Sequence, residues 1–186
     1  MKQPTQSKWI SLKEIVFFSV YSALIIAFKE MMNLLPNIEP VTVMLIALTC
    51  VFGVKALLPA YVFSLIQIVI HGFHLWNFMY LYVWAAVVLI SLCFLPLHKF
   101  IEAKTGKLSS LLLTVLWSAV AAIFGIGFGT LCSIPYIIAL GAEGAVAWII
   151  SGFAFDILHS IGNVVISAIM FYPLYKLLKV AKKKLV

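Results

Sequence analysis

The sequence contains no arginine, and only 10% of its 186 residues are charged. Soluble domains carry about a quarter charged residues, so this scarcity excludes an ordinary soluble domain. The 13 basic residues are all lysines, and they lie at the ends of apolar stretches instead of covering one solvated face. A surface for DNA or RNA needs such a face, and we therefore expect no nucleic acid partner.

Cysteine and catalytic motifs are scarce as well. The three cysteines, Cys50, Cys93 and Cys132, lie inside apolar runs without CxxC spacing, which indicates neither a disulfide framework nor a zinc site. The sequence also lacks HExxH, GxSxG and GxxxxGK[ST], the motifs of zinc proteases, serine hydrolases and P-loop ATPases. We therefore expect no enzyme, no cofactor, no resident metal and no ATPase activity of its own.

Apolar residues, by contrast, make up 65% of the chain, and the mean hydropathy is +1.16. A membrane-spanning helix needs roughly 20 residues, so this content allows about six crossings. We predict an all-α integral membrane protein with a single membrane domain over residues 1–186: a cytoplasmic tail (1–11), a six-helix bundle (12–175) and a basic cytoplasmic tail (176–186). The expected spans are residues 12–35, 41–52, 56–70, 78–97, 111–132 and 145–175. The second is short, so it must borrow flanking residues or be shielded by its neighbours.

The lysines support an even number of spans. Lysine gathers on the cytoplasmic side of membrane proteins, and six spans with both termini inside place every lysine except Lys29 on that side. An odd number would put the two lysine-rich ends in opposite compartments. The pattern predicts a multi-pass protein of the cell membrane, in contact with the lipid bilayer, with both termini cytoplasmic.

The predicted outer side collects hydrogen-bonding and aromatic side chains. Such a mixture suits the capture of a small molecule that is partly polar and partly apolar. The alternative is an interfacial aromatic belt with solvated loops. The outer candidates for substrate binding are Asn37, Glu39, His71, His74, Trp76, Asn77, Tyr80 and Tyr136.

The last predicted span carries a polar stripe. His159, Ser160, Asn163 and Ser167 follow Asp156 by 3, 4, 7 and 11 residues, which places all five on one helical face. Asp156 lies about 16 Å along this helix, near mid-membrane. A carboxylate there costs roughly 2.5–3.5 kcal/mol to insert, so it must be paired, protonated or facing a wet cavity. We favour a cavity lining; the alternative is an Asp156–His159 hydrogen bond that only fixes packing.

Two patterns of small residues bear on helix packing. Ser19, Ala23 and Ala27 recur at every fourth residue of the first span, which leaves a shallow groove for another helix, internal or external. Between Phe124 and Thr130 glycine alternates with larger residues. Alternate positions do not share one helix face, so we expect these glycines to loosen the helix or to permit close backbone approach.

Together these features resemble the substrate-capture subunits, or S components, of energy-coupling factor vitamin transporters. The resemblance covers nearly the whole chain: six helices in fewer than 200 residues, cytoplasmic ends, no ATPase motif, and the AxxxA of Ala23 and Ala27 in the first helix. It implies that Ser19, Ala23 and Ala27 dock on a transmembrane coupling subunit that sits on two cytoplasmic ATPase subunits. It also implies a bacterial cell-membrane protein that binds a vitamin outside and topples in the bilayer to release it.

The vitamin is a separate inference. Residues 37–41, Tyr80 to Trp84, and Phe155-Asp156 with His159 and Asn163 look similar to the branch associated with cobalamin uptake. This likeness adds Trp84, Asp156, His159 and Asn163 to the expected substrate-binding set. Other vitamins remain open, although Lys29 as the one outer cation suits a highly anionic ligand poorly.

Two rival functions use the same residues. One is a self-sufficient, proton-coupled secondary transporter with Asp156 and His159 as the relay, although the sequence shows no convincing inverted repeat. The other is a membrane enzyme with a metal held by His71, His74, Asp156 and His159.

Overall fold

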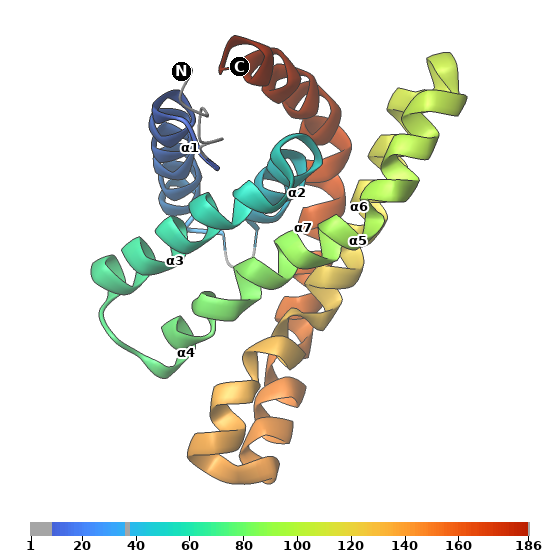
Figure 1. Cartoon of the computed structure of the whole chain (residues 1–186). Helices are drawn as coiled ribbons and strands as arrows, with labels where there is room; N and C mark the ends of the chain where they lie inside the picture. Colours follow the sequence, from blue (N-terminus) through green and yellow to red (C-terminus); the bar gives the residue numbers. More distant parts are fainter. Residues whose placement is uncertain (1–8, 36–37, 186) are drawn as a thin grey trace.

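A computed structural model describes residues 9–35 and 38–185, apart from the side chain of Trp76. Within these ranges all regular structure is helical (Figure 1). Two short 3-10 turns, η1 (Gly53–Ala56) and η2 (Gly106–Leu108), connect longer helices. The α-helices are α1 (Leu12–Met31), α2 (Val41–Phe52), α3 (Leu57–His71), α4 (Leu75–Phe78), α5 (Tyr80–Lys104), α6 (Ser109–Cys132) and α7 (Ile134–Leu185).

Helix α7 is two helices that meet at Gly141. This residue has φ 73° and ψ −177°, which no helical residue adopts and which suits glycine because it lacks a Cβ. The short part, residues 134–140, therefore turns away from the long part, residues 142–185, and together they form the hairpin at the bottom of Figure 1. The link between the expected spans 111–132 and 145–175 is thus largely helical.

Four helical stretches in the described part are long and apolar enough to cross a membrane. They are Val41–His71, Tyr80–Lys104, Gly106–Cys132 and Ile134–Leu185. The first of them contains both α2 and α3, with a bend at Gly53, where φ is 62°. Helix α1 is not among them, because it carries two charged residues near each end: Lys13, Glu14, Lys29 and Glu30. Several long apolar helices are compatible with a membrane protein.

The short helix α2 lies inside the bundle. Eleven of its 12 residues are buried, and both α5 and α7 pack against it. At 1.5 Å per residue it is about 18 Å long, which is less than the roughly 30 Å of hydrocarbon in a bilayer. Shielding by its neighbours, one of the two solutions expected for this segment, is therefore the one that the structure adopts.

The most extensive helix pair is α6 with α7, and glycine makes it possible. A Cβ added to Gly125 would stand 2.7 Å from the backbone of Ser160, and one added to Gly129 would collide with the carboxylate of Asp156. Gly127 faces open space. Gly125 and Gly129 are four residues apart and share one face of α6. Of the two expected roles, these glycines therefore permit close backbone approach. The packing motif is GxxxG, and Gly127 takes no part in it.

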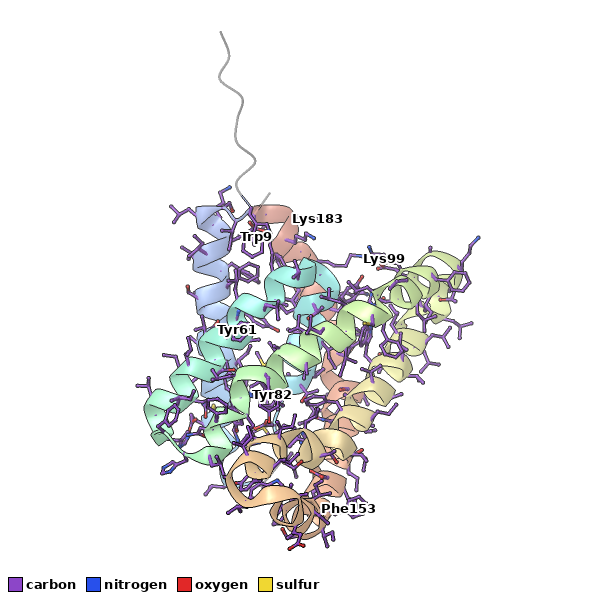
Figure 2. The ribbon with its side chains drawn as sticks, turned by 60° about the horizontal axis from the view of Figure 1, so that its bottom comes forward. Trp9, Tyr61, Tyr82, Lys99, Phe153 and Lys183 are labelled. Atoms are coloured by element: carbon purple, nitrogen blue, oxygen red, sulfur yellow. The ribbon has the colours of Figure 1, made fainter. Side chains whose placement is uncertain are left out.

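The molecule has two chemically different ends. The start of α1 and the end of α7 lie together at the top of Figure 1, and Figure 2 places Lys99 and Lys183 at the same end as Trp9. Lys55 belongs there too, because its Nζ lies 2.7 Å from Oε1 of Glu14 in the first turn of α1. We call this the basic end. The other, with α4 and the Gly141 hairpin, is the opposite end.

The predicted helix boundaries differ from the observed ones mainly at their ends. Helix α1 stops at Met31, four residues before the expected end. Helix α5 passes through Pro96 to Lys104, because proline is tolerated within apolar helices whose neighbours shield the backbone. Helix α7 continues to Leu185, so the basic segment expected as a tail after residue 175 is helical.

Candidate ligand-binding site

Six rings from four helices meet in the interior and form what we call the aromatic cluster. Trp84 of α5 is central: its ring centroid lies 5.5 Å from Phe63 and 6.0 Å from Phe128. His159 of α7 closes the cluster, edge-on to Phe128 at 4.6 Å. All of these side chains are buried, and Trp84 is fully so. The members are Phe63, Tyr80, Trp84, Phe124, Phe128 and His159.

Two members of this cluster carry polar atoms that have no hydrogen-bond partner among the described residues. They are the indole Nε1 of Trp84 and both ring nitrogens of His159, which is 1% exposed. One turn after Phe63 on α3, the Oε1 of buried Gln67 is also without a partner. More than nine in ten buried polar groups in proteins are hydrogen-bonded, so orphaned groups at one place require an explanation. A bound molecule that supplies the missing partners is one such explanation.

An ion pair lies beside the cluster. Lys29, near the end of α1, contacts Glu39, just before α2, with 2.7 Å between Nζ and Oε2; the side chains are 18% and 6% exposed. Both residues lie near enough to His159 for their charges to act on its ring, and the charge of Glu39 also acts on Tyr80. The next residue back, Ile38, packs against Gly162 of α7. Ile38 and Glu39, just before α2, therefore lie on the His159 side of the cluster.

A second acidic residue organises the end of α3. Oε1 of Glu30 accepts a hydrogen bond from Nε2 of Gln67 at 2.9 Å and lies 3.3 Å from Nε2 of His71. His71 is therefore tied to α1 instead of projecting freely from a loop. Glu30 therefore joins the end of α1 to the last two turns of α3, which follow Phe63 of the aromatic cluster.

The polar stripe of α7 faces inward, as its spacing predicts, but most of it binds the backbone of α6. Asp156 Oδ1 accepts from the N–H of Gly129 at 2.9 Å, and Asn163 Nδ2 donates to the carbonyl of Ala121 at 2.9 Å. Ser160 donates to the carbonyl of Ala122 at 3.0 Å. For Asp156 the structure therefore favours the packing alternative, because its carboxylate is bound to a neighbouring helix. The hydrogen-bond partner is Gly129, however, and not His159. Of the stripe, His159 faces the aromatic cluster.

The remaining outer candidates that the structure describes are not members of the cluster. Asn77 donates to the carbonyl of Gly72 at 2.6 Å and so braces the turn before α4. His74 is an exposed residue in that turn. Tyr136 stacks on Trp148 across the Gly141 hairpin, with centroids 4.0 Å apart. Asn37 and the side chain of Trp76 lie outside the described residues.

The structure brings together Glu39, Tyr80, Trp84 and His159 from the expected set, and it adds residues that sequence reasoning missed. Lys29 was noticed only as an outer cation, and Phe63 and Phe128 were not singled out. Gln67 carried a usable signal, because it is the single amide in the apolar run of residues 56–70. Phe63 and Phe128 carried none, because phenylalanine is ordinary in an apolar helix.

The ligands required by the metal-enzyme hypothesis do not converge. The described ranges contain no group of three or more His, Cys, Asp or Glu side chains placed to hold a metal ion. His71 contacts Glu30, Asp156 bonds to Gly129, and His159 faces aromatic rings.

The small residues of α1 point away from the bundle. Ser19, Ala23 and Ala27 are all exposed, and the larger side chains of the same outer surface, Val20 and Leu24, are 57% and 46% exposed. No helix in the described part of the chain therefore covers Ala23 and Ala27. Ser19 also lines a groove of about 280 Å³ between α1 and α3.

Comparison with known proteins found no matching family model, no matching curated protein and no matching solved structure. Function must therefore be inferred from the residues and their arrangement.

Proposed function

We propose that this chain is a ligand-capture subunit of a membrane transporter, with a binding site formed by the aromatic cluster and the Lys29–Glu39 pair. The observation that carries the proposal is the burial of unpartnered polar atoms on Trp84 and His159 inside a wall of aromatic rings. Small-molecule sites are mostly apolar with a few convergent polar groups, and this is their composition. Packing alone gives no benefit for leaving those atoms unpaired.

The chemistry of the site indicates the class of ligand. The Trp84 Nε1–H can only donate, so the ligand must present a hydrogen-bond acceptor there. Neutral His159 can donate or accept, and the aromatic faces favour a ring or another flat apolar portion. The one ion pair at the site is neutral overall, which disfavours a highly anionic molecule. A vitamin fits this description, and cobalamin, with its many amides, is our leading candidate.

The exposed stripe of Ser19, Ala23 and Ala27 supports the second half of the proposal, a partner that supplies energy. Within a membrane, small residues on an outward helix face allow another helix to approach closely. By the resemblance to S components, that helix belongs to a transmembrane coupling subunit carrying two ATPase subunits. Six spans, cytoplasmic termini and a bacterial cell membrane complete the proposal, and the clustering of lysines at the basic end supports this orientation.

The first test is a binding titration of the purified chain in detergent against a panel of vitamins. We expect one vitamin to bind in the micromolar range or tighter, and to raise the thermal unfolding midpoint because a ligand that binds only the folded state stabilises it. His159→Phe should keep the packing of the cluster but reduce affinity. A His74→Phe control, at an exposed position away from the cluster, should not. Equal loss in both, or no binding by any vitamin, contradicts the proposal.

A second test separates capture from self-sufficient transport. In liposomes with a proton gradient and no partner proteins, we expect the chain to bind the vitamin without accumulating it. Accumulation under these conditions would favour the proton-coupled transporter, with Asp156 and His159 as its relay.

A further inference from the structure

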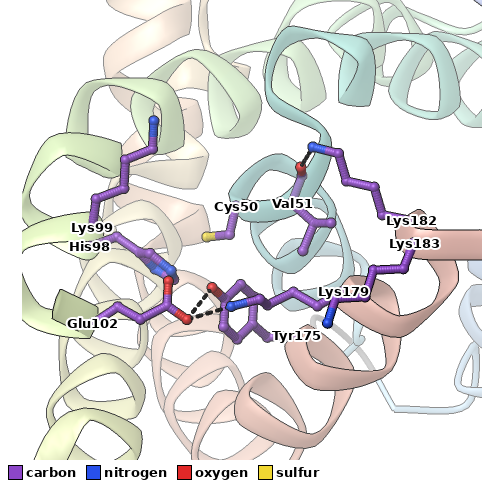
Figure 3. A pocket seen from close by; sticks show the side chains of 9 residues that line it. All are labelled: Cys50, Val51, His98, Lys99, Glu102, Tyr175, Lys179, Lys182 and Lys183. Atoms are coloured by element: carbon purple, nitrogen blue, oxygen red, sulfur yellow. Dashed lines mark hydrogen bonds and ion pairs between the residues drawn. The ribbon is translucent and has the colours of Figure 1, made fainter. Parts of the chain in front are cut away.

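A separate cavity of about 550 Å³ opens at the basic end (Figure 3), and it shares no lining residue with the aromatic cluster. Three helices form it: α2 contributes its last turn, α5 its C-terminal half, and α7 the stretch after Pro173. Its base is Tyr175, whose hydroxyl donates to Glu102 at 2.9 Å. The lining residues are Cys50, Val51, His98, Lys99, Glu102, Tyr175, Lys179, Lys182 and Lys183.

The lining is strongly positive. The lining contains four lysines and one acidic residue, Glu102. Two of the lysines form a hydrogen bond or ion pair with described residues. Lys179 contacts Glu102 at 2.6 Å, and Lys182 donates to the carbonyl of Val51 at 2.6 Å. Among the described residues, neither Lys99 nor Lys183 has a hydrogen bond or ion pair. An anion that enters the cavity therefore meets two ammonium groups that need not give up a partner.

His98 supplies an independent sign of a ligand. Its Nδ1 accepts a hydrogen bond from the indole Nε1–H of Trp117 at 2.8 Å, so the proton of the neutral ring is on Nε2. This Nε2 has no hydrogen-bond partner in the described part of the chain, and His98 is only 1% exposed. Figure 3 shows the ring directed toward Glu102 and Tyr175, into the cavity. A fixed, buried N–H donor beside free lysines suits an anionic oxygen.

We propose that this cavity binds the phosphate headgroup of an anionic phospholipid. Lys99 and Lys183 would hold the phosphate, and the Nε2–H of His98 would donate to one of its oxygens. Basic pockets between membrane helices are suited to such headgroups. A lipid fits better than a soluble phosphate because exposed apolar side chains flank the lysines along both helices. On α5 these are Leu97 and Phe100, and on α7 Leu177 and Val180, between 43% and 65% exposed.

The site is independent of the proposed transport function. It lies at the basic end, whereas the aromatic cluster lies near the α1–α2 segment, and the two share no residue. Its occupation would hold the ends of α2, α5 and α7 together at the lipid surface.

The test is a competition experiment with the full chain in detergent. A fluorescent dioctanoyl phosphatidylglycerol is the probe, and the competitors are unlabelled dioctanoyl phosphatidylglycerol, dioctanoyl phosphatidylcholine and inorganic phosphate. We expect phosphatidylglycerol to displace the probe, phosphatidylcholine to do so at least about tenfold less well, and inorganic phosphate to fail. Lys99→Gln with Lys183→Gln should weaken probe binding about 25-fold, since each lysine near an anionic headgroup contributes about fivefold.

The matched control is Lys104→Gln with Lys107→Gln, which removes the same charge at the same end but outside the cavity. It should change probe binding by less than about twofold, apart from general screening. Equal weakening by the two double variants would overturn the proposal, because it would indicate attraction to overall charge. Equal competition by phosphatidylcholine would do the same, and competition by inorganic phosphate as strong as that of phosphatidylglycerol would make the ligand a soluble anion.

Discussion

Asp156 on α7 accepts a hydrogen bond from the backbone N–H of Gly129 on α6, with 2.9 Å between Oδ1 and N. This contact requires the helices to approach so closely that a Cβ on Gly129 would collide with the carboxylate. One turn earlier, Gly125 approaches the backbone of Ser160 in the same way. The polar stripe and the glycines are therefore two sides of one interface, and His159 is held toward the aromatic cluster because its neighbours on α7 are fixed to α6.

Gly125→Ala should destabilise the protein by about 1–3 kcal/mol, because the added methyl meets backbone atoms of Ser160 that cannot move aside without shifting α7. Gly127→Ala is the matched control two residues away. It faces open space and should be neutral or stabilising by up to about 1 kcal/mol, since alanine favours the helix. Thermal unfolding in detergent measures both. Similar midpoints for the two variants would contradict the close α6–α7 approach.

Trp84→Phe should lower stability less than Trp117→Phe does, because both changes leave a cavity but the indole N–H lost from Trp84 has no partner among the described residues. The same change should weaken binding of the vitamin about three- to tenfold, the worth of one hydrogen bond. Trp117→Phe leaves a similar cavity at an equally buried tryptophan but also removes a hydrogen bond. It leaves Nδ1 of His98 unpaired and lowers stability by about 1–2 kcal/mol more while affinity stays the same.

Calorimetric titration and unfolding on the same samples would measure both quantities. If Trp84→Phe destabilised the protein as much as Trp117→Phe without affecting affinity, the aromatic cluster would be a packing core and not a binding site.

Ala23→Leu should abolish ATP-dependent uptake while leaving vitamin affinity within about twofold, because the larger side chain fills the groove on the exposed face of α1 and blocks close helix approach. Ala103→Leu, on the exposed surface of α5, is the control and should transport normally. Uptake by cells and binding by the purified chain give the two readouts. Lost affinity in Ala23→Leu would argue against a docking role for this face.

The Lys29–Glu39 pair should behave as a coupled, partly buried unit. Glu39→Gln or Lys29→Met alone should lower stability by about 1–3 kcal/mol, because each leaves a poorly solvated charge without its partner. The double variant should lose less than the sum of the two, which a double-mutant cycle detects. Lys179→Met removes one partner of the exposed Lys179–Glu102 pair and should change stability by less than about 1 kcal/mol. Strict additivity at Lys29 and Glu39 would mean that the pair does not form.

Helix identity was predictable from the sequence because apolar runs of this length have one stable form in a bilayer. The limits of α2 were predicted correctly, since Pro40 and Gly53 mark its ends. The end of α5 was not, because Pro96 reads as a helix terminator and only packed neighbours reveal that it is tolerated. The break between the last two spans was expected between residues 133 and 144, and Gly141 lies in that range, but the helical structure on both sides of it was not expected.

The candidate site was only partly predictable. The spacing of Asp156, His159 and Asn163 along the chain is enough to place them on a common helix face. It does not indicate which of them satisfies its hydrogen bonds on α6. That outcome depends on the glycines of a different helix.

The amino-acid sequence alone determined that the chain is helical, strongly apolar and basic at its ends, because composition, periodicity and the positions of lysine are local properties. Only the tertiary structure decided that polar atoms of His159 and Trp84 are buried without partners, that α2 is enclosed, and that Lys99 and Lys183 border one cavity with His98. These relations join residues from separate helices, and such contacts depend on how side-chain volumes fit when the helices pack.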